Sequence, residues 1–261
     1  MKLARFEVQG KESYGVVTGD MVKAIRGLPW ETVDYSGAVH PLNKVALLAP
    51  VRPPNVFAIG ANYRRHVKEC GAKVPSAPLV FIKATTTVTD PGKPVVLPAM
   101  APNEVDYEAE LAIVIGKTCR RVSETDALSH VLGYTCANDI SARDCQLKID
   151  SQWARGKSFD TFCPLGPWIE TELDGDNCAI GLKLNGKVMQ SSRTNDMIFS
   201  CRTVISYCSQ FATLLPGTVI ITGTPEGVGM ARKPPVFLKA GDVMEVTIDG
   251  IGTLRNHVTA E

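Results

Sequence analysis

The amino-acid sequence predicts an α+β fold that is rich in β-strands. Short strand-like segments bounded by Gly and polar turns fill residues 1–50, and strand patterns dominate again from residue 162 onward. The few helical patterns do not alternate regularly with strands, which argues against a doubly wound parallel sheet and favours a β-sandwich or barrel. At 261 residues, the chain is long enough for one large domain with a small appendage.

The composition is that of an ordinary globular protein. Hydrophobic residues make up 44% of the chain and charged residues 21%. The formal net charge of +1 gives no reason to expect nucleic acid or an anionic membrane as a partner. The N-terminus lacks the apolar region of a signal peptide, and no run approaches the ~18 apolar residues of a membrane-spanning helix.

Eight cysteines are scattered along the chain. A chain of this length does not need disulfides to stabilise its core, so we expect mostly buried free thiols in a reducing, cytoplasmic location. No two cysteines form a CxxC pair, and the missing close spacing of ligands argues against a zinc site.

The N-terminal region is expected to form a small β unit. The segments ARFEV, YGVVT and DMVKAI are strand-like and are separated by Gly and polar turns. The Pro-rich segment APVRPPN, residues 49–55, then marks a boundary. We therefore divide the chain into an N-terminal β region, residues 1–50, and a main domain, residues 51–261.

The first part of the main domain mixes strands with a helix. Residues 55–63 are expected to form a buried strand that ends at Gly60, and residues 63–71 a short helix ended by Gly71. Residues 84–104 are rich in Thr, Pro and Gly and suggest a long connection. The apolar run at residues 111–115 predicts a second buried strand.

Later segments add helices and further strands. Apolar residues at helical spacing predict a helix over residues 124–134, and residues 138–150 suggest a second helix or a turn leading into one. Residues 197–217 predict a helix of about five turns. The remaining strand-like segments are PWIETEL, AIGLKLNGKVMQ, GTVIITGT and DVMEVTIDGIGTLRNHV. The Asn-Gly in LNGKV predicts a tight hairpin, and the last segment predicts a closing hairpin.

Carboxylates stand directly in front of the buried strand in VDYEAELAIVIGK, residues 105–117. Side chains alternate between the faces of a strand, so Glu108 and Glu110 point the same way, about 7 Å apart. Two like charges raise each other's pKa unless a cation lies between them, and oxygen ligands suit Mg²⁺, Mn²⁺ or Ca²⁺. The alternative, which Glu-x-Glu alone favours, is a solvated strand edge. Asp106 shares the same face.

A third carboxylate, Asp139, follows a strand-like stretch in YTCANDISARD. If the residues after Asn138 are helical, one helix face carries four polar side chains: Asp139, Arg143, Gln146 and Asp150. An acid at a helix start is also a common N-cap, so the spacing leaves a metal ligand and a cap equally open.

His66 and Glu69 are three residues apart in a predicted helix and therefore lie next to each other. An imidazole held by a carboxylate is a common general base, although surface His–Glu pairs are also frequent. The GKS at residues 156–158 is no P-loop, because Ser151 replaces the first glycine. The loop ITGTPEGVGM could present backbone amides and Thr224 to an anion, or be a plain turn.

Five motifs, in this order, resemble the fumarylacetoacetate hydrolase family: GxNYxxHxxE, DYEAELAIVIG, NDISARDxQ, GKSFDTFCPLGP and TGTPEGVG. The resemblance covers about residues 53–258. It implies a mixed β-sandwich roll with peripheral helices, usually as a homodimer. The short chain is similar to bacterial and mitochondrial members, which act on acylpyruvates, oxaloacetate or hydroxy-dienedioates. One departure is Ala61, where GANY replaces the commoner GRNY.

The resemblance also implies roles for individual residues. One divalent metal, Mg²⁺ or alternatively Mn²⁺ or Ca²⁺, would be held by Glu108, Glu110 and Asp139. A small 2-oxo or 2-hydroxy acid that chelates the metal would contact Arg143, Gln146, Lys157 and Thr224. The catalytic residues would be His66 and Glu69, on a segment that acts as a lid in the family, together with Lys157. Asp106 matches no ligand of the family.

The resemblance favours a metal-dependent hydrolase that cleaves the C–C bond of an acylpyruvate. His66 would deprotonate a water, and the electrons of the broken bond would leave as a pyruvate enolate. An oxaloacetate decarboxylase or a 2-hydroxyhepta-2,4-diene-1,7-dioate isomerase would use the same residues, so these alternatives stay open. A non-catalytic protein that binds a metal or a small acid is disfavoured, because the whole residue set is intact.

Overall fold

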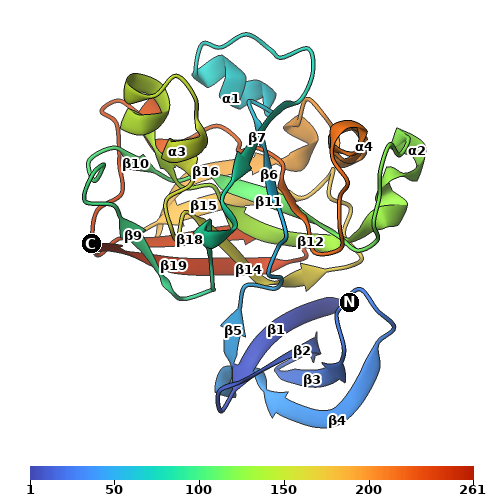
Figure 1. Ribbon diagram of the computed structural model, residues 1–261. Coiled ribbons are helices and arrows are strands. Elements are labelled where there is room, and N and C mark those ends of the chain that lie inside the picture. Colours follow the sequence, from blue (N-terminus) through green and yellow to red (C-terminus); the bar gives the residue numbers. More distant parts are fainter.

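Strands dominate the structure and short helices surround them, which confirms the predicted β-rich α+β class. The computed structural model describes all 261 residues. Figure 1 shows a small N-terminal body of strands and a larger body, with α1 (Arg64–Glu69) and α3 (Ala154–Lys157) at the end of the larger body remote from the N-terminal one. None of the helices is both long and apolar enough to cross a lipid bilayer.

The N-terminal body is an antiparallel meander. Its elements are β1 (Lys2–Val8), β2 (Lys11–Thr18), β3 (Met21–Arg26), β4 (Asp34–Pro41), the 3-10 turn η1 (Leu42–Lys44) and β5 (Ala46–Leu48), which pairs with β1. β1 also pairs with β14 (Cys163–Glu170) of the larger body, with Lys2 opposite Glu170 and Leu3 opposite Ile169. The N-terminal strands therefore continue the main sheet.

The main sheet runs through both bodies in the order β4-β3-β2-β1-β14-β12-β11-β17-β6-β7. Its further strands are β12 (Val131–Asn138), β11 (Ala109–Ile115), β17 (Val219–Ile221), β6 (Val56–Gly60) and β7 (Leu79–Lys83). Every residue of β11 is buried. A strand covered on both faces has no reason to alternate, which explains the continuous apolar run in the sequence.

A second sheet packs against the main one in the order β16-β15-β18-β19-β9. Its strands are β16 (Lys187–Arg193), β15 (Ala179–Leu184), β18 (Val243–Ile248), β19 (Gly252–Ala260) and β9 (Pro94–Leu97). The two sheets share a core cluster of 39 buried residues. Both predicted hairpins are present: β18 pairs with β19, and the β15–β16 turn has positive φ at Asn185 (52°) and Gly186 (78°), as a tight hairpin turn requires.

Two predicted helices are shorter than the sequence suggested. The segment 124–134 contains only α2 (Glu124–Ala127) and the 3-10 turn η3 (Leu128–His130), because β12 begins at Val131 and pairs with β11 and β14. The segment 197–217 contains α4 (Cys201–Phe211), which begins late because Ser200 Oγ caps it by accepting from Thr203 N. Strand pairing and helix capping, more than the helical spacing of apolar residues, thus decide where these two helices begin and end.

Two other segments are more divided than the sequence suggested. Residues 84–104 are no single connection, since they hold η2 (Thr85–Thr87), β8 (Val88–Thr89) and β9. Residues 138–150 form no continuous helix, and the structure is nearer to the alternative, a turn that leads into one, because residues 143–149 are helical. They contain β13 (Ser141–Ala142), which pairs with β10 (Val105–Asp106), and then the π-helical turn η4 (Cys145–Ile149). Two 3-10 turns, η5 (Thr194–Asp196) and η6 (Gly229–Ala231), complete the fold.

Candidate active site

Three buried carboxylates converge where β11 begins and β12 ends. Oxygen atoms of Glu108, Glu110 and Asp139 lie within 4.8 Å of one another. β11 pairs with β12 so that Ala109 lies opposite Asn138, which brings the two chain segments together. Asp139 N then donates to Glu108 O at 2.9 Å. The register of the sheet therefore places Asp139 next to the glutamates. The helix face that the sequence suggested has no part in this.

Cationic side chains fix these carboxylates. Lys157 Nζ lies 2.7 Å from Glu108 Oε2 and 2.6 Å from Asp139 Oδ2. The other oxygen of Asp139 accepts from Lys83 Nζ at 2.6 Å. Lys83 was not among the residues predicted from the sequence; it ends the strand-like segment LVFIK and is only 1% exposed. The signal in the sequence was a single lysine at the end of an apolar strand-like segment. Such a lysine indicates an acidic partner, because lysine is almost never fully buried without one.

The buried charges of the site are unequal in number. The carboxylates are Asp106, Glu108, Glu110 and Asp139, and the cations that face them are Lys83, Arg143 and Lys157, all buried. Glu110 alone among these carboxylates has no cationic partner; its Oε2 accepts from Gly223 N at 2.7 Å. Burial and the neighbouring carboxylates raise the pKa of Glu110 well above its ordinary value.

This donor set fits a divalent cation. Three carboxylates supply only oxygen ligands, which Mg²⁺, Mn²⁺ and Ca²⁺ prefer. A cation next to Glu110 would stabilise its ionised form, which burial and the neighbouring carboxylates otherwise disfavour. Glu108 differs from Glu110: burial acts to raise its pKa, but Lys157 and Arg143 beside it hold that pKa well below the usual range.

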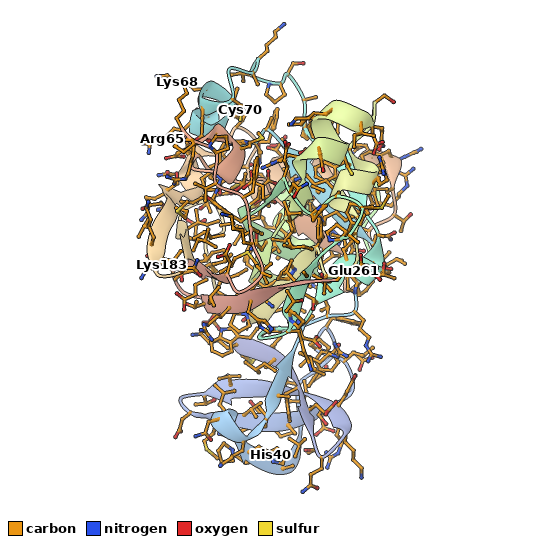
Figure 2. All side chains as sticks on the ribbon, turned by 90° about the vertical axis from the view of Figure 1, so that its left-hand side faces the viewer. His40, Arg65, Lys68, Cys70, Lys183 and Glu261 are labelled. Atoms are coloured by element: carbon orange, nitrogen blue, oxygen red, sulfur yellow. The ribbon has the colours of Figure 1, made fainter.

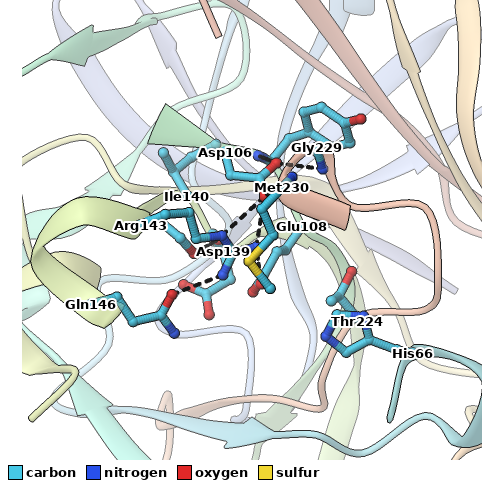
Figure 3. A network of polar contacts seen from close by, with 12 residues as sticks. His66, Asp106, Glu108, Asp139, Ile140, Arg143, Gln146, Thr224, Gly229 and Met230 are labelled. Carbon is cyan, nitrogen blue, oxygen red and sulfur yellow. Dashed lines mark hydrogen bonds and ion pairs between the residues drawn. The ribbon is translucent and has the colours of Figure 1, made fainter. Parts of the chain in front are cut away.

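Arg143 connects the cluster to Asp106, the acid to which no role was assigned from the sequence. Its Nη2 lies 2.7 Å from Glu108 Oε1, and its Nε donates to Asp106 Oδ2 at 3.0 Å (Figure 3). Asp106 is fully buried and also accepts from the backbone N–H of Tyr107, Gly229 and Met230. Asp106 therefore fastens the loop that contains η6 to the guanidinium that holds Glu108.

The predicted polar face of residues 139–150 is only partly realised. Arg143 Nη1 donates to Gln146 Oε1 at 2.9 Å, and both side chains line the same cavity. Asp150 instead lies at the surface and pairs with Arg155, whose Nη2 is 2.6 Å from Asp150 Oδ1. The prediction that Asp150 shares this face is wrong, because the chain forms a short strand and a π-helical turn instead of a regular helix.

Thr224 lies at the carboxylate cluster, and its hydroxyl is already engaged. Its Oγ1 donates to Ala109 O at 3.0 Å and accepts from Gln190 Nε2 at 2.8 Å. Gln190 Oε1 in turn accepts from Ala109 N at 2.8 Å, so this amide ties β16 to the start of β11. Gln190 could not be found from the sequence, because a single amide in an alternating strand is unremarkable without its partners.

The His66–Glu69 pair lies on α1, above the cavity. His66 Nδ1 is 3.3 Å from Glu69 Oε2, and both carboxylate oxygens of Glu69 accept from Gly227 N, at 2.9 and 3.0 Å. This contact fastens α1 to the loop that follows β17. Burial acts to lower the pKa of His66, but hydrogen bonds to Cys70 and Glu69 and the charge of Glu108 raise it, to about 9.

The carboxylate cluster and most of its neighbours line one cavity of about 220 Å³. Its lining includes the predicted residues His66, Glu108, Glu110, Asp139, Arg143, Gln146, Lys157 and Thr224. Apolar walls come from Ile59, Phe81, Trp153 and Met230. Glu69 is held at the rim through Gly227 and does not line the cavity. The structure thus brings the predicted site residues to a single place.

A larger depression of about 760 Å³ lies between the N-terminal strands and residues 85–93. Two of its cations, Arg5 and Arg52, are both paired with Glu12. No cluster of three potential metal ligands lies there. The chemistry therefore points to the smaller cavity, despite the difference in volume.

Comparison with protein-family models gives two matches. Residues 55–259 match the family described as fumarylacetoacetate (FAA) hydrolase, C-terminal. Residues 1–50 match a family described as Rv2993c-like, N-terminal.

Curated relatives include the mitochondrial oxaloacetate tautomerase FAHD2A of Homo sapiens, which is 48% identical over 225 residues. That match covers 84% of this chain and 71% of the relative. The mitochondrial oxaloacetate tautomerase Fahd2a of Rattus norvegicus is 45% identical over 222 residues, with the same coverage of 84% and 71%.

Solved structures resemble the whole chain. A 5-carboxymethyl-2-hydroxymuconate delta-isomerase from Mycobacterium smegmatis is 42% identical, with a TM-score of 0.91 and 100% of both chains covered. A 2-hydroxyhepta-2,4-diene-1,7-dioate isomerase from Mycobacterium marinum is 39% identical, also with a TM-score of 0.91, and the match covers 100% of this chain and 99% of that one.

Proposed function

The chain belongs to the fumarylacetoacetate hydrolase family, and from this premise we propose that it is an enzyme that moves a proton between atoms of a compact 2-oxo dicarboxylate. Keto–enol tautomerisation of oxaloacetate is the reaction to test first. Relatives named as oxaloacetate tautomerases support this choice, and so do structural neighbours named as isomerases. Tautomerisation and such isomerisations share one step, the transfer of a proton to or from carbon next to a carbonyl group.

The cavity itself is the observation that carries the proposal. Its volume of about 220 Å³ lies below the roughly 300–1,000 Å³ of sites for drug-sized ligands and suits a short acid. Carboxylates, cations and the imidazole of His66 all line this cavity. A proton donor and acceptor together with fixed cations beside a short acid are what enolisation needs.

Enolisation begins with removal of a proton from C3 of the keto acid. The C–H electrons move into the C2–C3 bond, and the C2 carbonyl electrons move onto its oxygen. Lys157 and Arg143 are held by Glu108, so their positive charges are already in position when that oxygen becomes negative. Protonation of the oxygen gives the enol, and the reverse sequence restores the ketone without any co-reactant.

His66 is the proposed carrier of the C3 proton. In the direction from enol to ketone, its imidazolium donates a proton to C3, and the raised pKa of about 9 keeps the ring protonated near neutral pH. In the other direction the neutral ring accepts the proton. Glu69 orients the ring and is itself held by Gly227 N.

A divalent cation held by Glu108, Glu110 and Asp139, with Mg²⁺ as our first choice and Mn²⁺ or Ca²⁺ as alternatives, would stabilise negative charge on the oxygens of the 2-oxo acid. The roles of Gln146 and Thr224 as contacts of the substrate carboxylate are part of the same proposal. Because the hydroxyl of Thr224 is engaged, its backbone N–H is the group we expect to contact the carboxylate.

The test is the decay of the enol absorbance of oxaloacetate with the wild-type protein, Mg²⁺ and EDTA. We expect catalysis that EDTA abolishes and that His66→Gln lowers by roughly 10²–10⁴-fold. His40→Gln is the matched control, since His40 lies in the N-terminal body, far from α1 (Figure 2). If wild-type protein with Mg²⁺ leaves the enol decay at its spontaneous rate, the tautomerase proposal fails.

Hydrolysis of acylpyruvates is the second candidate, and the observation that favours it is the intact His66–Glu69 pair. A neutral His66 would then deprotonate a water that attacks the distal carbonyl. Release of acetate and pyruvate from acetylpyruvate would support this function, and release of CO₂ from oxaloacetate would support decarboxylation. A homodimer in a reducing, cytoplasmic setting remains our expectation for the native enzyme, and all eight cysteines are free in the structure.

A further inference from the structure

A second group of potential metal ligands lies on α1, outside the carboxylate cluster. His66, Glu69 and Cys70 have ligand atoms that all lie within 4.8 Å of one another. His66 Nδ1 is 3.3 Å from Glu69 Oε2 and 3.8 Å from Cys70 Sγ. Figure 2 shows Cys70 at the outer end of α1, and it is the only exposed thiol of the chain.

The spacing of His66 Nδ1 and Glu69 Oε2 matches one edge of a tetrahedral metal site. For Zn²⁺ the bonds to nitrogen and oxygen are about 2.1 Å long, and a tetrahedral angle then places the two atoms about 3.4 Å apart. The observed distance is 3.3 Å. Cys70 Sγ lies 3.8 Å from both ring nitrogens, so this exposed side chain must rotate toward Nδ1 for the sulfur to share the ion.

The ligand types select a different ion from the carboxylate cluster. A thiolate and an imidazole favour Zn²⁺ and similar thiophilic ions, whereas an all-oxygen set favours Mg²⁺, Ca²⁺ or Mn²⁺. We propose that His66, Glu69 and Cys70 form a binding site for a thiophilic divalent cation of the Zn²⁺ class, with water as the fourth ligand. The site lies at the mouth of the cavity, since His66 and Cys70 both line it. In the sequence, only the spacing between cysteines argued against a zinc site. That spacing did not include His66 and Cys70, which are four residues apart.

The site is compatible with the contacts already present. Glu69 Oε2 faces His66, while Oε1 also accepts from Gly227 N, so Oε2 can bind a cation without detaching α1 from the loop after β17. Binding replaces the thiol proton of Cys70 and the Nδ1 proton of His66, and both leave to solvent as the bonds to the cation form. The site is reachable, since the side chains of His66 and Glu69 are 11% and 23% exposed.

Occupation of this site also has a consequence for catalysis, which rests on the proposed function. A cation bound to Nδ1 separates His66 from Glu69 and bars the ring from its protonated form. A proton carrier held in this way cannot exchange a proton at that nitrogen. The cation therefore inhibits the enzyme while it keeps α1 in contact with Gly227.

The experiment titrates the full-length protein with Co²⁺ in saturating Mg²⁺, so that the carboxylate cluster is already occupied. We expect one Co²⁺ per chain and a cobalt–thiolate charge-transfer band in the near ultraviolet. Cys70→Ser should abolish the band and weaken binding at least tenfold, and Glu69→Gln should weaken binding while the band remains. Lys68→Ser, an exposed change on the same helix, is the matched control and should leave both unchanged.

The outcomes separate this site from the proposed function. The absence of a band in the wild-type protein, or its persistence in Cys70→Ser, would overturn the site. Zn²⁺ should inhibit tautomerisation in the wild-type protein at least tenfold more strongly than in Cys70→Ser, each compared with its own zinc-free rate. Equal inhibition of the two proteins would overturn the inhibitory role. A cobalt band in a protein that does not turn over oxaloacetate would uphold the site and reject the proposed function.

Discussion

Glu110 is the residue on which metal affinity should depend most directly, because no cationic side chain compensates its charge. We expect Glu110→Gln to weaken Mn²⁺ binding by more than the roughly 10–100-fold that loss of a supporting hydrogen bond costs a metal site. Calorimetric titration or the paramagnetic signal of free Mn²⁺ measures this. Asp150→Asn is the control, since that acid pairs with Arg155 at the surface. An unchanged affinity in Glu110→Gln would remove it from the ligand set.

Asp106 should matter although it does not line the cavity. Asp106→Asn leaves one oxygen to accept from Gly229 N, but its new NH₂ group faces donors on Arg143 and Met230. Breaking a buried pair of this kind typically costs about 3–5 kcal/mol. We expect a drop of that order in the free energy of unfolding, measured in urea, together with a lower kcat. A variant with wild-type stability and rate would show that Arg143 is positioned without it.

His66 should make stability depend on pH in a defined direction. Its pKa is about 9 in the folded protein, against 6.5 for an unperturbed histidine, so protonated His66 favours folding. This contribution is fully present below about pH 6.5 and is lost as pH rises through about 9. In Mg²⁺-free buffer, the difference in unfolding free energy between wild type and His66→Gln should shrink over that range. A difference that grows with pH would contradict the raised pKa.

At the scale of elements, substitutions at two glycines distinguish the cost of backbone strain from the effect of distorting the site. Gly186 in the β15–β16 turn has φ of 78° and open space around it, so Gly186→Ala should cost about 1–2 kcal/mol and leave catalysis unchanged. A methyl group at Gly229 would collide with Val236 O and lie 2.5 Å from Asp106 Oδ1. Gly229→Ala should therefore lower kcat as well as stability. Urea unfolding and the enol assay on both variants check this.

The strands were the elements that could best be predicted from the sequence. β11 and the β15–β16 hairpin depend on local signals, namely a continuous apolar run and an Asn-Gly turn. The second part of the segment 124–134, from Val131 onward, was assigned wrongly because its helical spacing competes with pairing of β12 to strands that are distant in sequence. Single-sequence patterns contain the first kind of information and lack the second.

The same distinction applies to the site. Glu108 and Glu110 could be grouped by strand alternation, and His66 with Glu69 by helical spacing, because each pair is local. Lys83 and Gln190 were missed, since their partners lie 56 and 34 or more residues away along the chain and are reached only through the sheets. Asp139 joins the glutamates through strand register and not through a helix face.

At the scale of the whole molecule, we propose that residues 1–50 and 51–261 are two structural units that unfold together. They share strand pairing between β1 and β14 and a core cluster of 15 buried residues that includes Leu3, Ile25 and Leu165. Variants that keep only Trp30 or only Trp153 report on the two units separately. We expect coincident urea transitions in the two variants. Two separated transitions would show that the units are independent.

A metal site in which Glu110 has no cationic side-chain partner makes the supply of cations part of the folding equilibrium. A folded chain that binds Mg²⁺ while the unfolded chain does not gains about 2.7 kcal/mol at a hundredfold excess over Kd. The melting temperature should therefore rise with the logarithm of free Mg²⁺ and fall on chelation. In a cell short of magnesium, such a protein would lose lifetime as well as activity, so its abundance would follow the metal status of its compartment.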